Sequence, residues 1–167
     1  LTPATVRVQG RLKREPGRLA LDDVRVETGG LRLAGGLSLS DLATDDPLLS
    51  ARVTSPRLSM TEARPYVPFG ILPPDTGAFF RDTLREAVFT GLEGRIQGRL
   101  SRIRQMDRDD NARVLSVQTR VEQGVLSFGA KVPPFKDIAG RIRFAGRDIL
   151  FENITGRFGL SSLSLSG

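Results

Sequence analysis

The chain lacks several residue types on which many enzymes and metal sites depend. Its 167 residues include no cysteine, no histidine and no tryptophan, and only one tyrosine. The absence of cysteine excludes a scaffold held together by disulfides. Because histidine is also absent, the usual general base, the usual thiol nucleophile and the common zinc ligands are all missing. These absences argue against the commonest kinds of catalytic centre.

The chain also lacks a long apolar run. None approaches the roughly 20 consecutive apolar residues that a membrane-spanning helix requires. With 39% hydrophobic and 26% charged residues, the composition is that of an ordinary globular domain with a core. The sequence starts without methionine and stops on the strand-like LSLSG, so we expect it to be an internal piece of a longer protein.

Carboxylates are the remaining candidates for catalysis. They cluster at Asp22-Asp23, Asp45-Asp46 and Asp107–Asp110, in turn-like or bulge-like sequence where Asp is favoured for local hydrogen bonds. No two of them stand out as an acid and base pair. The run that starts at Asp107 lacks the glycine and the glutamate that an EF-hand loop needs at its sixth and twelfth positions, which predicts a charged hairpin tip. We therefore expect a protein that is not an enzyme and has no metal or cofactor.

Basic residues are in excess, with 25 Lys and Arg against 19 Asp and Glu and a net charge of +6. This balance favours anionic partners such as phosphate-bearing lipids or nucleic acid. Sheets that bind nucleic acid usually display aromatic side chains beside basic ones. Here aromatics make up 6% of the chain, and Phe144 shares the parity of Ile142 rather than that of Arg141 and Arg143. The pattern argues against nucleic acid as the partner.

Apolar residues recur at every second position, which predicts β-strands with one apolar face. In the first such stretch, residues 5–13, Val6, Val8 and Leu12 alternate with polar and charged residues. Further strands are expected at 31–39, 48–54, 92–100, 112–121, 124–128, 138–144, 147–158 and 162–166. Clean alternation is typical of antiparallel sheets with one solvated face, because buried parallel strands are apolar on both faces.

Two stretches about 130 residues apart repeat the same rhythm. They read GRLKREPGRLALDDVRVETGGLRLAGG from Gly10 and GRIRFAGRDILFENITGRFGLSSLSLSG from Gly140. The alignment pairs Gly10-Arg11-Leu12 with Gly140-Arg141-Ile142, Gly17-Arg18 with Gly146-Arg147, and Leu31–Gly35 with Leu163–Gly167. In each copy the apolar parity changes across a polar pair, Asp22-Asp23 or Glu152-Asn153, which predicts a β-bulge. Such a unit cannot bury its own apolar face, so it has to stack on neighbours.

A proline-rich segment and a helical pattern interrupt the strands at residues 62–90. The helix is expected near 76–89, with Asp75 or Thr76 as its N-cap and Gly91 just past its end. Its apolar face would consist of Phe80, Leu84, Ala87 and Val88. Two roles stay open, a helix that plugs or flanks the sheet and a surface helix that touches a membrane. The segment separates strand block 1–61 from strand block 91–167 within what we expect to be a single domain.

The chain resembles the AsmA-like superfamily of bacterial envelope proteins, which includes the AsmA, TamB and YhdP types. The resemblance depends on PPFKDIAGRIRFAGRDILFENITGRFGLSSLSLSG (133–167), the preceding VEQGVLSFGAKV (121–132) and the looser copy at 6–40. The passage ILPPDTGAFFRDTLREAVFTGLEGRIQGRL (71–100) is similar to the proline, helix and strand passage of the YhdP type. Together these stretches cover most of the chain.

The resemblance implies a long, curved antiparallel sheet of repeated hairpin units, forming an open groove or half-barrel with an apolar concave face. AsmA-like proteins are anchored in the inner membrane by an N-terminal helix, extend through the periplasm and are implicated in moving phospholipid to the outer membrane. The implied partners are therefore phospholipid, neighbouring repeats of the same longer chain, and the membrane through segments outside this sequence. The resemblance carries no catalytic residue.

Two arrangements of the apolar strand faces are consistent with the sequence. In an open groove they would hold acyl chains without directional contacts, because each buried CH₂ contributes about 0.8 kcal/mol. In a closed sandwich the same side chains would form the core, and the protein would be a structural or protein-interaction module of the envelope without a lipid ligand. The candidate groove-lining residues are Val6, Val8, Leu12, Leu31, Leu33, Leu37, Leu92, Ile96, Leu100, Ile142, Phe144, Leu163 and Leu165.

Overall fold

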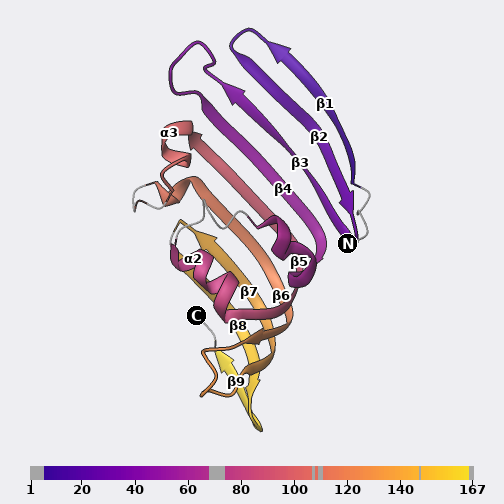
Figure 1. Cartoon of the computed structure of the whole chain (residues 1–167), viewed down its shortest axis with the longest axis vertical. Helices are drawn as coiled ribbons and strands as arrows, with labels where there is room; N and C mark the ends of the chain where they lie inside the picture. Colours follow the sequence, from indigo (N-terminus) through magenta and orange to yellow (C-terminus); the bar gives the residue numbers. More distant parts are fainter. Residues whose placement is uncertain (1–5, 68–73, 107, 109–110, 147, 166–167) are drawn as a thin grey trace.

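Nine β-strands and a few short helical segments make up the protein. The computed structural model describes residues 6–67, 74–106, 108, 111–146 and 148–165 (Figure 1). The strands form one antiparallel sheet in the order β1 to β9, so each strand pairs with its neighbours in the chain and β1 and β9 are the edges. Because these two edges do not pair with each other, the sheet is open. This confirms the predicted fold class, a mainly β protein with one long antiparallel sheet.

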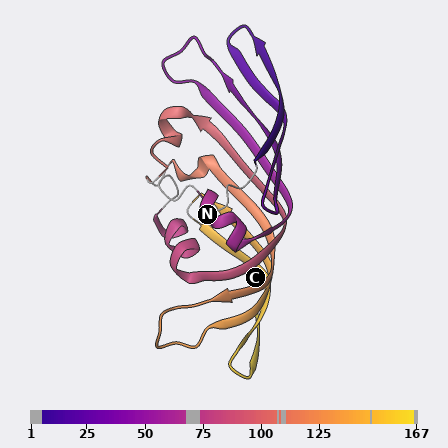
Figure 2. The same ribbon diagram turned by 45° about the vertical axis from the view of Figure 1, so that its right-hand side comes forward.

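The strands are β1 (Arg7–Glu15), β2 (Arg18–Thr28), β3 (Leu31–Ser40), β4 (Leu48–Ser59), β5 (Leu84–Arg99), β6 (Leu115–Leu126), β7 (Phe135–Ala145), β8 (Asp148–Phe158) and β9 (Ser161–Leu165). The helical segments are α1 (Met60–Ala63), η1 (Arg64–Tyr66), α2 (Pro74–Ala78), the π-helical turn η2 (Phe79–Thr83), α3 (Leu100–Ile103) and η3 (Ala112–Val114). In Figure 2 the sheet bows, and the helical segments lie on its inner, concave side.

The predicted alternation places apolar side chains on the concave face. Across β6 and β7, Val117 lies opposite Phe144 and Thr119 opposite Ile142, and all four side chains are at least half-buried. The intervening positions, such as Arg141 and Arg143, are exposed on the convex face. Since side chains of a strand alternate between the two faces of a sheet, one face is apolar and the other is charged.

A bulge interrupts each of five strands where the backbone enters the left-handed region. One residue with φ between 50° and 58° marks each of these bulges, namely Asp23 (53°), Gly91 (58°), Gln123 (54°), Asp137 (52°) and Asn153 (50°). The strand register shifts beside each of them. The bulges predicted at Asp22-Asp23 and Glu152-Asn153 are thus confirmed. Because a bulge bends its strand and increases the local twist, the series accounts for the bow of the sheet.

Gln123 is the least suitable of these residues for its backbone conformation, because only Gly, Asn and Asp commonly adopt positive φ. We expect Gln123→Gly to raise the free energy of unfolding by about 0.5–1 kcal/mol, since relief of the backbone strain exceeds the entropic cost of glycine. Ser116→Gly, at an exposed position of the same strand with ordinary φ, should instead lower it. Urea denaturation of both variants measures the difference, and a Gln123→Gly protein less stable than the parent would contradict it.

The sequence repeat is a structural repeat with an offset of 130 residues. Strand β2 (Arg18–Thr28) corresponds to β8 (Asp148–Phe158), and β1 and β7 end at equivalent residues. Every β8–β9 residue pair has a β2–β3 counterpart at this offset, such as Gly156 with Leu163 and Val26 with Leu33. The alignment of Leu31–Gly35 with Leu163–Gly167 is therefore wrong by two residues, because β3 and β9 begin at 31 and 161.

The helix expected near 76–89 is wrong in its second half. Helical backbone ends at Thr83, and β5 begins at Leu84. Residues 88–90 pair with β4 on one side and β6 on the other, with Phe89 opposite both Leu58 and Val121. The run Val-Phe-Thr is rich in β-branched and aromatic side chains, and strand pairing on both sides outweighs the helical spacing.

Other predicted boundaries also change. The helix α2 begins at Pro74, so Asp75 lies in its first turn and is not its N-cap, and Gly91 is a bulge within β5 and not a helix end. The strands expected at 112–121 and 124–128 are one strand, β6, that continues through its bulge. The predicted hairpin tip at Asp107–Asp110 lies largely outside the described residues.

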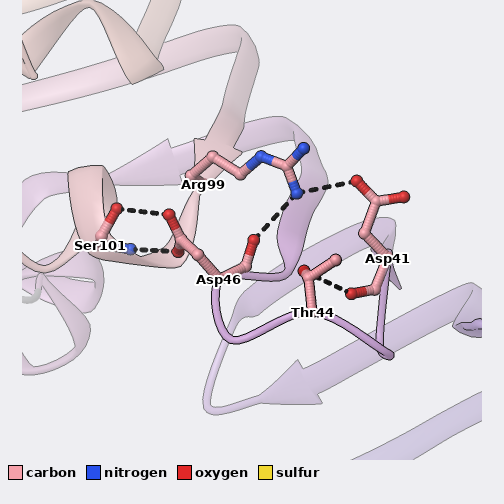
Figure 3. A network of polar contacts seen from close by, with 5 residues as sticks. All are labelled: Asp41, Thr44, Asp46, Arg99 and Ser101. Atoms are coloured by element: carbon pink, nitrogen blue, oxygen red, sulfur yellow. Dashed lines mark hydrogen bonds and ion pairs between the residues drawn. The ribbon is translucent and has the colours of Figure 1, made fainter.

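Loop 41–47 is tied to the start of α3 by hydrogen bonds (Figure 3). Asp46 accepts from the backbone N–H of Ser101 at 2.9 Å and from its hydroxyl at 2.7 Å. The Arg99 guanidinium donates to the Asp46 carbonyl at 2.9 Å and lies 2.7 Å from the Asp41 carboxylate. The hydrogen bonds from Ser101 hold the pKa of Asp46 below its ordinary value of 3.8. Asp46 thus caps α3 from a neighbouring loop.

Asp46→Ala should lower the melting temperature by a few degrees at neutral pH, because two hydrogen bonds of α3 are lost. A carboxyl group whose pKa is lower in the folded state stabilises the fold above its ordinary pKa, and this stabilisation is lost as the pH falls through the folded pKa. The gap between parent and variant should therefore close below about pH 3.8. Asp45→Ala, at the exposed neighbouring position, is the control. A gap that stays constant well below pH 3.8 would contradict this role of Asp46.

Candidate functional site

All nine strands contribute apolar side chains to the concave face of the sheet. Between bulges, every second residue of a strand lies on this face. At a bulge the alternation shifts by one residue, so the face stays continuous. Its members include Val8 and Leu12 from β1, Leu21 and Val26 from β2, Leu33 and Leu37 from β3, Leu58 from β4, Phe89, Leu92 and Ile96 from β5, Val117 and Val121 from β6, Ile142 and Phe144 from β7, Phe151 from β8, and Leu163 and Leu165 from β9.

The middle of this face is a closed core. Ile142 and Phe144 are each 3% exposed, and Phe79 and Phe80 of η2 pack against the cluster to which they belong. The ring centroids of Phe80 and Phe144 are 5.1 Å apart, and Phe79 lies 6.3 Å from Phe144 and 6.3 Å from Phe151. The predicted helix could either flank the sheet or touch a membrane. The part of it that is helical, up to Thr83, packs against the sheet.

The α1 segment covers another part of the same core, beside β4 and β5. Its start is fixed by a capping box, in which Ser59 and Glu62 exchange hydrogen bonds of 3.2 Å between side chain and backbone. Behind this cap, Met60 is 1% exposed. Among the described residues, the core that includes these helical segments extends from β3 to β8, whereas β1, β2 and β9 contribute no residue to it.

An apolar cavity of about 210 Å³ lies between the covered strands and the helical segments. The atoms that line it are all apolar in character, in contrast to the polar hollows of the convex face. The lining residues are Leu58, Met60, Ala63, Val67, Phe80, Phe89, Leu92, Ile96, Met106, Leu115, Val117, Thr119 and Phe144. For comparison, an apolar cavity of about 150 Å³ stays dry and admits a molecule as large as benzene.

The two ends of the concave face are open. On β1, Val8 and Leu12 are 62% and 67% exposed, and on β9 Leu163 and Leu165 are 45% and 60% exposed. Apolar side chains of this size are usually buried, so a continuous exposed apolar surface marks a site of interaction. The whole chain exposes 11,020 Å², whereas a compact monomer of its 18.2 kDa mass would expose about 8,100 Å².

The structure divides the thirteen candidate groove residues into three groups. The buried ones are Leu31, Ile142 and Phe144, and the half-buried ones are Leu33, Leu92, Ile96 and Leu100. The exposed ones are Val6, Val8, Leu12, Leu37, Leu163 and Leu165. Leu92, Ile96 and Phe144 meet in the cavity. The prediction that the strand at 92–100 includes Leu100 is wrong, because β5 ends at Arg99 and Leu100 is the first residue of α3.

Sequence reasoning missed the side chains that complete the cavity. Leu115 and Val117 could have been found from strand parity, since they share a face with their strand neighbours, but Phe89 lies in the stretch whose spacing predicts a helix. Met60 and Met106 could not, because they come from short irregular segments that carry no periodic signal.

The convex face is charged and mainly basic. Arg141 and Arg143 lie 3.2 and 2.8 Å from the carboxylate of Glu152, and Lys13 lies 2.8 Å from that of Asp22. The hydrogen bond from Lys13 lowers the pKa of Asp22 below its ordinary value. Because these ion pairs are exposed, they contribute little to the stability of the fold. Their main effect is to keep the convex face hydrated.

The described residues contain no group of three or more acidic side chains that could hold a metal ion. In the same part of the chain, no helix has the length and apolarity that crossing a membrane would need. The protein is therefore an open antiparallel sheet with a charged convex face and an apolar concave face that is covered in its middle and exposed at its ends.

Comparison with known proteins adds no relative to this description. No protein-family model, no curated protein and no solved structure matches the chain. The resemblance to AsmA-like proteins stays a prediction from the sequence.

Proposed function

We propose that this protein is a non-enzymatic module that binds lipid acyl chains along its concave face. The observation that carries the proposal is the continuity of that face, from exposed Leu12 on β1 across the covered core to exposed Leu163 and Leu165 on β9. A closed sandwich would bury both ends. An apolar surface that is open to solvent at both ends suits a long, flexible, apolar ligand.

The energetics favour an acyl chain over a polar ligand. Each CH₂ that leaves water contributes about 0.8 kcal/mol, so a segment of five carbons contributes about 4 kcal/mol without any directional contact. Hydrogen-bonding side chains would be required to orient a polar ligand, and the cavity lining offers only apolar surface. The concave face therefore selects for length and apolarity.

A cation beside the open end suits the headgroup of such a lipid. Arg14 shares its parity with Leu12 and lies opposite Leu19 on β2, so it belongs to the concave side near the β1–β2 turn. It is exposed and makes no ion pair within the described part of the chain. An exposed guanidinium attracts phosphate and steers anionic lipids toward the apolar surface.

The resemblance to AsmA-like proteins extends the proposal to phospholipid, to the periplasm and to lipid transport from the inner to the outer membrane. In that setting the chain would be one section of an inner-membrane-anchored envelope protein, and lipid would move along the apolar face from one section to the next.

Mass spectrometry of bound lipid tests the proposal. The purified chain is extracted with organic solvent, and the extract is compared with that of a control protein of similar charge purified in parallel. We expect phospholipid at a stoichiometric level. A lipid content equal to that of the control would contradict lipid binding and favour a structural or protein-interaction module.

A further inference from the structure

The outer edge of β1 is free, whereas the same edge of its repeat counterpart β7 is occupied. Residues of β1 correspond to residues of β7 at the 130-residue offset, since Leu12 pairs with Leu21 as Ile142 pairs with Phe151. Strand β7 pairs on its other side with β6, where Thr119 lies opposite Ile142. Strand β1 has no such neighbour within the described residues.

Two differences from β7 raise the exposure of β1, namely the missing neighbouring strand and the lack of helical segments over this end of the sheet. Ile138 and Ile142 of β7 are 7% and 3% exposed, but the equivalent Val8 and Leu12 of β1 are 62% and 67% exposed. All nine residues of β1 are exposed. A strand with free backbone N–H and C=O groups along one edge is a template for pairing with another extended segment.

The charges of β1 restrict what can pair with it. Four of its residues are basic, namely Arg7, Arg11, Lys13 and Arg14, and its only acid is Glu15. Asp22 and Asp23 of β2 lie 2.8 Å from Lys13 and 3.9 Å from Arg11, and the other two basic residues make no ion pair within the described part of the chain. Like charges opposite each other destabilise a strand pair, and opposite charges stabilise it.

A second copy of this chain does not complement the edge. Pairing of β1 with another β1 would bring its basic residues together, and β9, the other free edge, reads SSLSL and carries no acid. A segment with the pattern of β6 fits the backbone, but Arg120 of β6 faces Arg141, the counterpart of Arg11. The best partner therefore has the apolar alternation of β6 and acidic residues in place of its polar ones.

We propose that the free edge of β1 binds an extended segment in antiparallel register, with an apolar side chain at every second position and Asp or Glu between them. The apolar side chains of this segment extend the concave face and cover Val8 and Leu12. Its acids lie on the convex side, beside Arg11 and Lys13. The pairing uses the backbone edge and does not depend on bound lipid.

The test uses two synthetic peptides and the whole chain. The chain is first freed of lipid by washing it with organic solvent while it is bound to a resin, and it is then refolded. One peptide has the sequence of residues 115–126, and the other carries Gln118→Glu and Arg120→Glu, which place acids opposite Lys13 and Arg11. We expect the acidic peptide to bind roughly tenfold more tightly, to lose this advantage at high salt, and to slow hydrogen exchange at the amides of β1.

A charge exchange in the protein is the matched control. The Arg11→Glu protein should melt slightly below the parent, because the new carboxylate lies beside Asp22 and Asp23, so binding is measured well below its melting temperature. The acidic peptide should bind it more weakly than the parent and the unmodified peptide more tightly. Equal binding of both peptides, slowed exchange at β9 instead of β1, or self-association of the chain through β1 would overturn the proposal. Lipid content is measured on the untreated protein, so failure here and failure of lipid binding are separate results.

Discussion

Replacement of Ile142 by Asp is expected to unfold the protein. Ile142 is 3% exposed in the middle of the concave face, between Thr119 of β6 and Phe151 of β8. A carboxylate there would lose its hydration, and no cation is among the side chains of the core cluster. We expect a loss of more than about 4 kcal/mol, which is comparable to the total stability of many domains.

Ile142→Val provides the control, because it removes one methylene group and should cost about 0.5–1.5 kcal/mol. Circular dichroism during heating measures both variants. If the Ile142→Asp protein melts like the parent, the middle of the concave face is not the closed core described above.

Replacement of Leu163 by Asp is expected to have the opposite profile, with little effect on stability and a large effect on lipid binding. Leu163 is 45% exposed at the C-terminal end of the concave face, so its loss should change the free energy of unfolding by about 0.5 kcal/mol or less. Lipid binding should weaken at least tenfold, because the acyl chain loses the contact of a leucine side chain, about 1.5–3 kcal/mol, and meets a charge.

The control for this variant is Leu150→Asp. Leu150 has the same exposed fraction, 45%, but lies opposite Arg143 on the convex face. Titration of each protein with a fluorescent fatty acid measures the affinity. Equal affinities of the two variants would show that the concave face has no special role.

Much of the sheet could be predicted because strand alternation is a local property. The period of two in residues 5–13 places Val8 and Leu12 on one face, whichever strand pairs with them. The change of parity at Asp22-Asp23 predicts a bulge. The repeat adds a second copy of the same evidence, and the matching register of β1–β2 and β7–β8 bears it out.

The features that could not be predicted are set by tertiary contacts. The spacing of Phe80, Leu84 and Ala87 fits a helix face, and only the pairing of β5 with β4 and β6 shows that Leu84 starts a strand. Whether a given apolar side chain is buried depends on which strands the helical segments cover and on whether the strand has a neighbour on both sides. They cover Ile142 and leave Leu12 exposed, although both occupy the same position in the repeat.

The division of the concave face into a closed middle and open ends also resolves the two arrangements that alternation alone left open. Both occur in one molecule. The core around Phe144 supplies stability, and the exposed apolar residues of β1 and β9 cost solvation free energy in the isolated chain. A ligand that covers these ends would remove that cost and stabilise the outer strands.

Site-specific cross-linking tests the central claim, that lipid acyl chains lie on the concave face, most directly. A photoreactive phenylalanine derivative replaces Leu163 in one protein and Leu150 in another, and each is irradiated with vesicles of phosphatidylethanolamine and phosphatidylglycerol. We expect mass spectrometry to find phospholipid attached at position 163 and little or none at position 150. Equal attachment at both positions, or none at 163, would contradict it.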